Sequence, residues 1–204
     1  MKQGIPPEVI AALKSRAVRA RDMVSFTVRD SDTGDPVTRH YWSDVGQASL
    51  NVINPTSQLV ETRVFKGAGG LISVSDIPQV SNLTVQPVMI EISHLADTAQ
   101  LVRELDAKQG RVEIFRGVFA VDSLLQIAPA RARFIGFIDE ADVEESTETE
   151  PGKITLNCVS HLQEITRFNP ATRSNAYQQR RAPGDDFRKH VAVVGTWEQR
   201  WGEA

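Results

Sequence analysis

The hydrophobic residues of this chain alternate with polar ones over several short segments, a period of two that is typical of β-strands. Residues 111–119 begin with charged and apolar side chains in strict alternation, as a strand with one buried face does. Residues 133–139 and 153–159 contain runs of β-branched, aromatic and other apolar side chains that also favour strands. We therefore expect a mainly β protein, folded as a barrel or sandwich.

Further strand patterns lie in the first half of the chain. Residues 23–28 and 37–42 are rich in β-branched and aromatic side chains, and the turn-forming residues 31–36 between them predict a β-hairpin. Apolar residues that gather between glycine- or proline-containing segments predict three more strands, at 58–65, 71–74 and 83–92. Because Pro87 has no N–H to donate to a neighbouring strand, we expect it at a sheet edge or at a bulge.

Helical periodicity is confined to short segments. Residues 8–21 place apolar side chains at helical spacing among basic ones, which predicts an N-terminal amphipathic helix. Residues 98–105 predict a short mid-chain helix that has Asp97 as its N-cap and ends at residues 109–110. Residues 160–166 are expected to start another helix.

These patterns divide the chain into an N-terminal helix (1–21), a β-barrel region with room for two interwoven subdomains (22–165) and a C-terminal arm (166–204). The arm has six basic and two acidic residues between positions 167 and 190, a net charge of +4 in a chain whose net charge is −3. Arginine and aromatic residues are the types in which interfaces concentrate binding energy. The candidate assembly contacts are therefore Arg180, Arg181, Phe187, Trp197 and Trp201.

The sequence offers few candidates for membrane insertion, catalysis or cofactor binding. No apolar stretch approaches the roughly 20 residues that a membrane helix needs, and no secretory signal is recognisable, so we expect synthesis in a cytoplasm. Cys158 is the only cysteine, which leaves no internal disulfide and no cysteine-built zinc or iron–sulfur site within one chain. The histidines share no spacing, and no nucleophile–base pair is recognisable. We expect a non-enzymatic protein without metal or cofactor.

An acidic stretch, residues 139–150, contains seven carboxylates and no basic residue. It lacks the spaced ligands and the central glycine of a calcium loop. We therefore expect a solvated hairpin tip there and assign it no metal.

Four groups of residues, in this order along the chain, carry a resemblance to known proteins. They are residues 26–30 after the N-terminal helix, residues 72–78 leading to 83–85, the pair 112–117 and 134–139, and the series Gln178–Asp185, Phe187 and Trp201–Gly202. The last series is the most telling, because ordinary core patterning would not generate it. In this order the segments resemble the baseplate hub and tail-tip proteins of siphophages and of gene-transfer-agent particles.

The resemblance implies a structural subunit of the virion that closes the distal end of the tail tube. It implies a homo-oligomeric ring, with a trimer favoured, that contacts the distal tail protein, the tail-tip proteins and the receptor-binding proteins. DNA would pass through the lumen of such a ring without specific binding. Some relatives hold an iron–sulfur cluster near the C-terminal end, but Cys158 stands alone here and implies none.

Two alternatives remain open at this point. The first is a distal tail protein, which forms a hexameric ring between the tube and the hub and is also largely β. The second, from another class, is a carbohydrate-binding β-sandwich in which Trp42, Trp197 or Trp201 would form the sugar platform.

Overall fold

The computed structural model describes residues 5–16, 18–67, 71–78, 84–94, 105–146, 152–166, 174–190, 193–196 and 202. The chain divides into two compact units, Met1–Ile165 and Thr166–Ala204. Each unit is described by itself.

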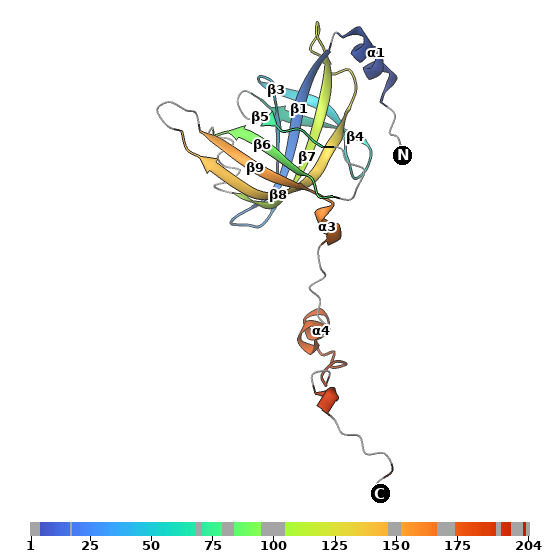
Figure 1. Ribbon diagram of the computed structural model, residues 1–204, viewed down its shortest axis with the longest axis vertical. Helices are drawn as coiled ribbons and strands as arrows, with labels where there is room; N and C mark the ends of the chain where they lie inside the picture. Colours follow the sequence, from blue (N-terminus) through green and yellow to red (C-terminus); the bar gives the residue numbers. More distant parts are fainter. Residues whose placement is uncertain are drawn as a thin grey trace. The chain divides into compact units, whose positions relative to one another are not determined.

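The first unit is built on one nine-stranded sheet within the described residues, as Figure 1 shows. It begins with helix α1 (Pro7–Ser15), and α3 (Gln163–Thr166) follows the last strand. The strands are β1 (Val18–Asp30), β2 (Pro36–Trp42), β3 (Gln47–Ile53), β4 (Val60–Lys66), β5 (Leu71–Val74), β6 (Pro87–Ser93), β7 (Leu105–Ala120), β8 (Ala130–Glu144) and β9 (Lys153–Ser160). The prediction of a mainly β protein with an N-terminal helix is confirmed.

Six of these strands close into a barrel. The sheet order is β3-β4-β2-β1-β7-β8-β9-β6-β5, and a parallel pairing of β3 with β8 joins the two ends of the first six strands. The weakest seam lies between β2 and β4, which share the single pair Tyr41 and Lys66. Strands β9, β6 and β5 extend from the second half of β8 (Figure 1).

Strands β1 and β7 contribute residues to two separate cores, one on each side of them, and are therefore buried on both faces. Residues 23–26 of β1 and residues 112–115 of β7 are each four consecutive buried positions. On the barrel side, the core consists of Met23, Leu50, Val52, Phe65, Phe115, Phe119 and Ala130. On the other side, a larger core joins Val24, Phe26, Ile114, Phe134 and Ile138 to apolar residues of β6 and β9.

The predicted hairpin of residues 23–28 and 37–42 is confirmed, but the N-terminal helix is shorter than predicted. Antiparallel pairs run from Met23 with Trp42 to Arg29 with Pro36. Helix α1 ends at Ser15, because Arg16 takes the left-handed conformation (φ 58°) as its C-cap, and β1 begins at Val18. Val18 and Ala20, which the sequence assigned to the helix region, therefore belong to a strand.

The prediction for Pro87 is confirmed locally, whereas the predicted end of the mid-chain helix was wrong. Pro87 is the first residue of β6 and pairs with Val159 of β9, while the described pairing of β5 with β6 covers only residues 90–92, so Pro87 lies at a local edge. Residues 109–110 do not end a helix, since β7 runs through them with Gln109 at φ 63° beside a register shift against β1. Leu105 is the first residue of β7, and the rest of the predicted mid-chain helix, 97–104, lies outside the described residues.

The acidic stretch 139–150 is only partly a hairpin tip. Its first half is strand, because β8 continues to Glu144 and pairs there with β9. Residues 147–150 lie outside the described residues. None of the described helices is long and apolar enough to cross a membrane.

Candidate assembly surfaces

The second unit contains helix α4 (Asn175–Arg181), where the sequence predicted an arm without periodicity. Ser174 explains the helix, since its side-chain oxygen accepts a hydrogen bond from the backbone N–H of Tyr177 at 3.2 Å. Serine is a common N-cap residue, but the arginine, asparagine and glutamine residues around it provide no apolar periodicity, so the sequence did not predict a helix here. Arg180 and Arg181, which were expected in an arm without regular structure, both lie in the last turn of α4.

The loop after α4 is tied back to the helix by two glutamine–aspartate hydrogen bonds. Gln178 Nε2 donates to Asp185 Oδ2 at 2.6 Å, and Gln179 Nε2 donates to Asp186 Oδ1 at 2.9 Å. The backbone N–H of Phe187 also donates to Asp185, at 3.0 Å. The hydrogen bond from Gln178 and then that from the Phe187 backbone lower the pKa of Asp185. The loop is held by polar contacts and not by a core.

The described residues of this second unit include no buried residue. Phe187 is 85% exposed, and Arg180 and Arg181 are exposed as well. Exposed phenylalanine and arginine side chains are of the types that protein interfaces favour. Trp197 and Trp201 lie outside the described residues, so their role as contacts stays a prediction.

Trp42 does not form the platform expected for a carbohydrate-binding module. Its indole N–H donates to the carbonyl of Gly46 at 2.9 Å, and its ring packs 6.0 Å from that of Phe119 against the barrel core. Gly67 closes the other side, because a Cβ there would lie 2.7 Å from the indole nitrogen. The tryptophan is thus part of the packing of the first unit.

A charged cluster that the sequence did not reveal lies inside the barrel, near the β2–β4 seam. Arg63 donates to Glu113 Oε2 at 2.8 Å and also forms an ion pair with Glu61. Arg111 donates to the second oxygen of Glu113 at 2.8 Å. Glu113 is only 8% exposed although it occupies the polar phase of the alternation at 111–119. Alternation alone could not identify it, because β7 has no solvent-facing side at this point.

Ser25 and His40 complete this cluster, but they are not arranged for catalysis. His40 Nδ1 lies 2.8 Å from Ser25 Oγ, to which Arg63 also donates at 3.0 Å. Ser25 is 2% exposed, so its hydroxyl is closed to a substrate. Burial and then the charge of Arg63 lower the pKa of His40. The arrangement joins β1, β2, β4 and β7 through polar contacts.

The described residues hold no group of three or more histidine, cysteine or acidic side chains that could bind a metal ion. Cys158 is buried in β9, and burial raises the pKa of its thiol to about 12. A thiol with that pKa is almost entirely protonated at neutral pH, and it packs as a small apolar side chain. This is the role that the sequence predicted for it.

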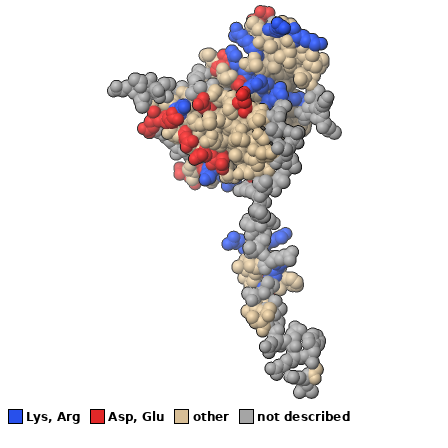
Figure 2. Space-filling model, viewed as in Figure 1, with Lys and Arg blue, Asp and Glu red and all other residues tan. Residues whose placement is uncertain are grey.

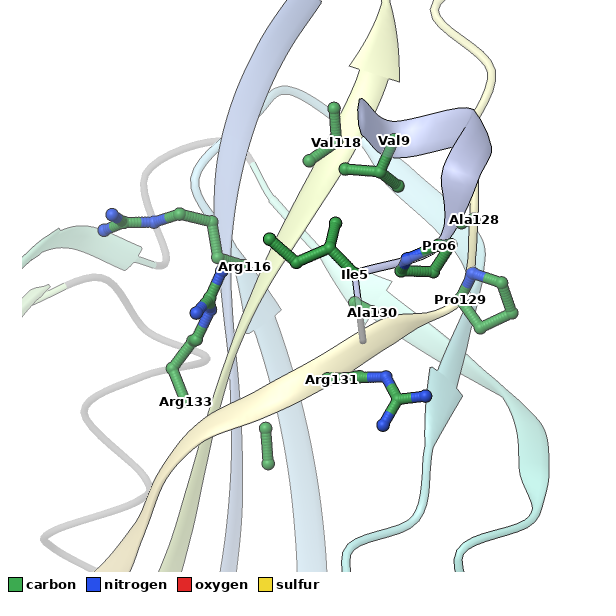
Figure 3. Close-up of a pocket in the computed structure, with 11 residues that line it drawn as sticks. Ile5, Pro6, Val9, Arg116, Val118, Ala128, Pro129, Ala130, Arg131 and Arg133 are labelled. Atoms are coloured by element: carbon green, nitrogen blue, oxygen red, sulfur yellow. The ribbon is translucent and has the colours of Figure 1, made fainter. Parts of the chain in front are cut away.

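A hollow of about 190 Å³ lies between α1 and the barrel, as Figure 3 shows. Its centre is apolar, with Ile5 and Val9 facing Val118. Arg116 and Arg133 lie to one side of these residues and Arg131 lies to the other (Figure 3). The sequence had not singled out these arginines, because they are spread over two strands.

Comparison with known proteins gives a fold and no family. No protein-family profile matches the sequence, and no curated protein matches it. A chain of a solved structure described as the virion of a native gene transfer agent particle is similar in structure, with a TM-score of 0.54 and 11% sequence identity. The match covers 83% of this chain and 50% of that chain, so this chain spans about half the length of its structural neighbour. The chain therefore shares the fold of a gene-transfer-agent virion protein over most of its length.

Proposed function

We propose that this protein is a non-enzymatic structural subunit of a phage-type virion, positioned at the distal end of the tail as part of the baseplate hub. It is made in the cytoplasm of the bacterial host and works as a homo-oligomeric ring, with a trimer favoured. In this position it would connect the tail tube to the tail tip and to the receptor-binding parts, and DNA would pass through its lumen without specific binding.

The observation that carries the proposal is the fold shared with a protein of a gene transfer agent virion, across 83% of this chain. That likeness agrees with the resemblance found in the order of the sequence segments. Neither rests on the other, since the sequence identity in the structural match is only 11%.

The design of the two units supports an assembly role. A barrel with two cores makes a stable body, whereas the second unit presents Phe187, Arg180 and Arg181 to solvent. Exposed aromatic and arginine side chains on a segment without a core are well suited to dock on neighbouring subunits.

The distal tail protein is the second candidate, because it too is largely β and forms a ring. The two proposals differ in position and symmetry. The hub reading predicts three-fold symmetry beyond the end of the tube, and the distal-tail reading predicts six-fold symmetry directly below it.

Electron microscopy of particles that carry a tagged copy of this chain tests both. We expect the tag at the distal end of the tail, with three-fold symmetry. A six-fold ring directly below the tube would replace the hub with the distal tail protein. Particles whose tails lack the tag at every position would overturn the virion role itself.

A further inference from the structure

Strand β8 carries opposite charges at its two ends. Arg131 and Arg133 lie near its start, whereas Glu140, Asp142 and Glu144 lie near its end. At a rise of about 3.3 Å per residue, Arg131 and Asp142 are up to about 36 Å apart. Because charges are screened within about 10 Å at ordinary ionic strength, the two ends of one copy cannot neutralise each other.

At the positive end, arginines without an ion pair among the described residues lie beside an exposed apolar surface. Arg131 Nε is buried and has no hydrogen-bond partner within the described part of the chain. Arg133 is exposed, and no ion pair joins it to another described residue. Arg116 is different, since it pairs with Asp22 at 2.7 Å. Beside these arginines, Ile5 at the centre of the hollow is 53% exposed (Figure 3).

The negative end is a row of carboxylates on one face of β8. Glu140, Asp142 and Glu144 alternate along the strand and are all exposed. Only Glu144 has a basic partner among the described residues, Lys153 at 3.5 Å. Figure 2 shows groups of acidic side chains over the part of this unit away from α1, with some basic side chains among them, and basic side chains gathered near α1.

The other edge of β8 has no strand partner along this row within the described part of the chain. Its pairing with β7 ends at Phe137, opposite Arg111, and among the described residues those after it pair with β9 alone. The three carboxylates form one exposed face here, since the residues between them point to the other face of the strand. A row of carboxylates of this kind can contact a surface whose rim is basic.

We propose that these two surfaces bind each other between copies, so that the carboxylate row of β8 in one copy seats on the arginine-rimmed hollow beneath α1 in a second copy. The two surfaces are different, so the contact is head-to-tail, and such contacts close into a ring when the rotation between copies divides a full turn. The inference deepens the proposed ring and rests on that proposal for its setting. It supplies the exposed Arg133 with an anionic partner and the unpaired carboxylates with cations.

Charge reversal on each surface separately tests the contact. The first variant combines Arg131→Glu with Arg133→Glu, and the second combines Glu140→Arg with Asp142→Arg. We expect each variant alone to self-associate on the order of tenfold or more weakly than the unaltered chain in sedimentation velocity at low salt. An equimolar mixture of the two variants should recover association as alternating pairs, because the reversed surface of each variant then faces a surface of opposite charge on the other. A closed three-membered ring is not expected from this mixture, since one of its three contacts would join two copies of the same variant.

Two controls separate this effect from unfolding and from general charge effects. Arg133→Glu alone changes an exposed side chain, so it should fold normally and still weaken association, with an unchanged β-sheet circular dichroism spectrum. Arg39→Glu changes an exposed arginine of β2 outside the hollow and should leave association unaltered.

Three outcomes would overturn the contact. The unaltered chain could remain monomeric, the reversed variants could associate as well as it does, or their mixture could fail to recover association. In those cases the acidic row is a device that protects an open strand edge from aggregation. The virion role is decided separately by the position of the tag in the particle, which does not depend on self-association of the purified chain.

Discussion

The two units of this protein use their aromatic residues in opposite ways. In the first unit, Phe26, Phe65 and Phe115 are fully buried in cores on either side of β1 and β7. In the second unit Phe187 is 85% exposed, and the described residues there contain no buried one. The contrast indicates that folding stability resides in the first unit, while Phe187, in the described part of the second unit, is available for contact with other molecules.

Deletion of residues 166–204 should have the largest effect of the changes considered. It should impair assembly but leave the folding of the first unit unchanged. We expect the shortened chain to retain the β-sheet circular dichroism of the first unit and to be absent from tails. The physical reason is that both cores lie within Met1–Ile165, whereas the exposed Arg180, Arg181 and Phe187 are removed. Immunoblots of purified particles measure the incorporation.

Either of two results would contradict the assignment of folding to the first unit and of docking to the second. Normal incorporation of the shortened chain would show that the second unit is no docking element. Loss of the β-sheet signal would show that the barrel depends on it for folding. A full-length chain with Phe187→Ala, Arg180→Ala and Arg181→Ala serves as a milder control. It should fold normally but be incorporated poorly into tails.

Alanine substitutions of one phenylalanine in each unit should differ sharply in their effect on stability. Phe26→Ala removes a side chain that is 0% exposed and should lower the free energy of unfolding by about 3–5 kcal/mol. Phe187→Ala, at 85% exposure, should change it by no more than about 0.5 kcal/mol. Urea denaturation followed by circular dichroism measures both, and equal losses would contradict the division of roles.

The sequence predicts the strands well, because most of them have one clear apolar phase. It predicts the two-sided burial of β1 and β7 poorly. Residues 112–115 contain Glu113 in the polar phase, and nothing local indicates that Arg63, about fifty residues away, meets it inside a barrel. Period-two alternation reports which residues share a face, but it does not report what covers that face.

The candidate surfaces show the same limit. Phe187 and the arginines of α4 could be chosen from composition, because their exposure follows from the lack of a local core. The arginine-rimmed hollow could not be chosen, since Arg116 and Arg131 come from different strands and meet only through the pairing of β7 with β8. Tertiary contacts of this kind leave no spacing signal in the sequence.

Glycine-to-alanine substitutions, one in each unit, should also differ in their effect on stability, but by a smaller amount. A Cβ at Gly136 would lie 2.1 Å from the backbone oxygen of Val159 in β9, whereas a Cβ at Gly195 would meet nothing within 4 Å. Gly136→Ala should therefore cost about 1–3 kcal/mol of stability, because β8 and β9 must move apart. Gly195→Ala should be nearly neutral. Thermal unfolding of both variants checks this, and a neutral Gly136→Ala would mean that the two strands separate easily.

The smallest expected effect is a pH dependence of stability that belongs to the first unit. Burial and the charge of Arg63 lower the pKa of His40 from its ordinary value of 6.5. The unfolded chain therefore binds a proton at this residue more readily than the folded chain. The stabilisation is fully present above pH 6.5 and declines as the pH falls from there toward the folded-state pKa.

Comparison of His40→Asn with the unaltered chain isolates this contribution. The free energy of unfolding, measured in urea at about pH 7.5 and about pH 5.5, should fall less on acidification in the variant. Glu61 does not interfere, because its hydrogen bond from Asn54 and its pairing with Arg63 lower its pKa from 4.5, so its effect lies at lower pH. The chain without residues 166–204 should show the same pH dependence as the full chain, since Ser25, Arg63 and Glu113 all remain around the histidine. A pH dependence that vanished with the second unit would place the titrating group there and would contradict the assignment to His40.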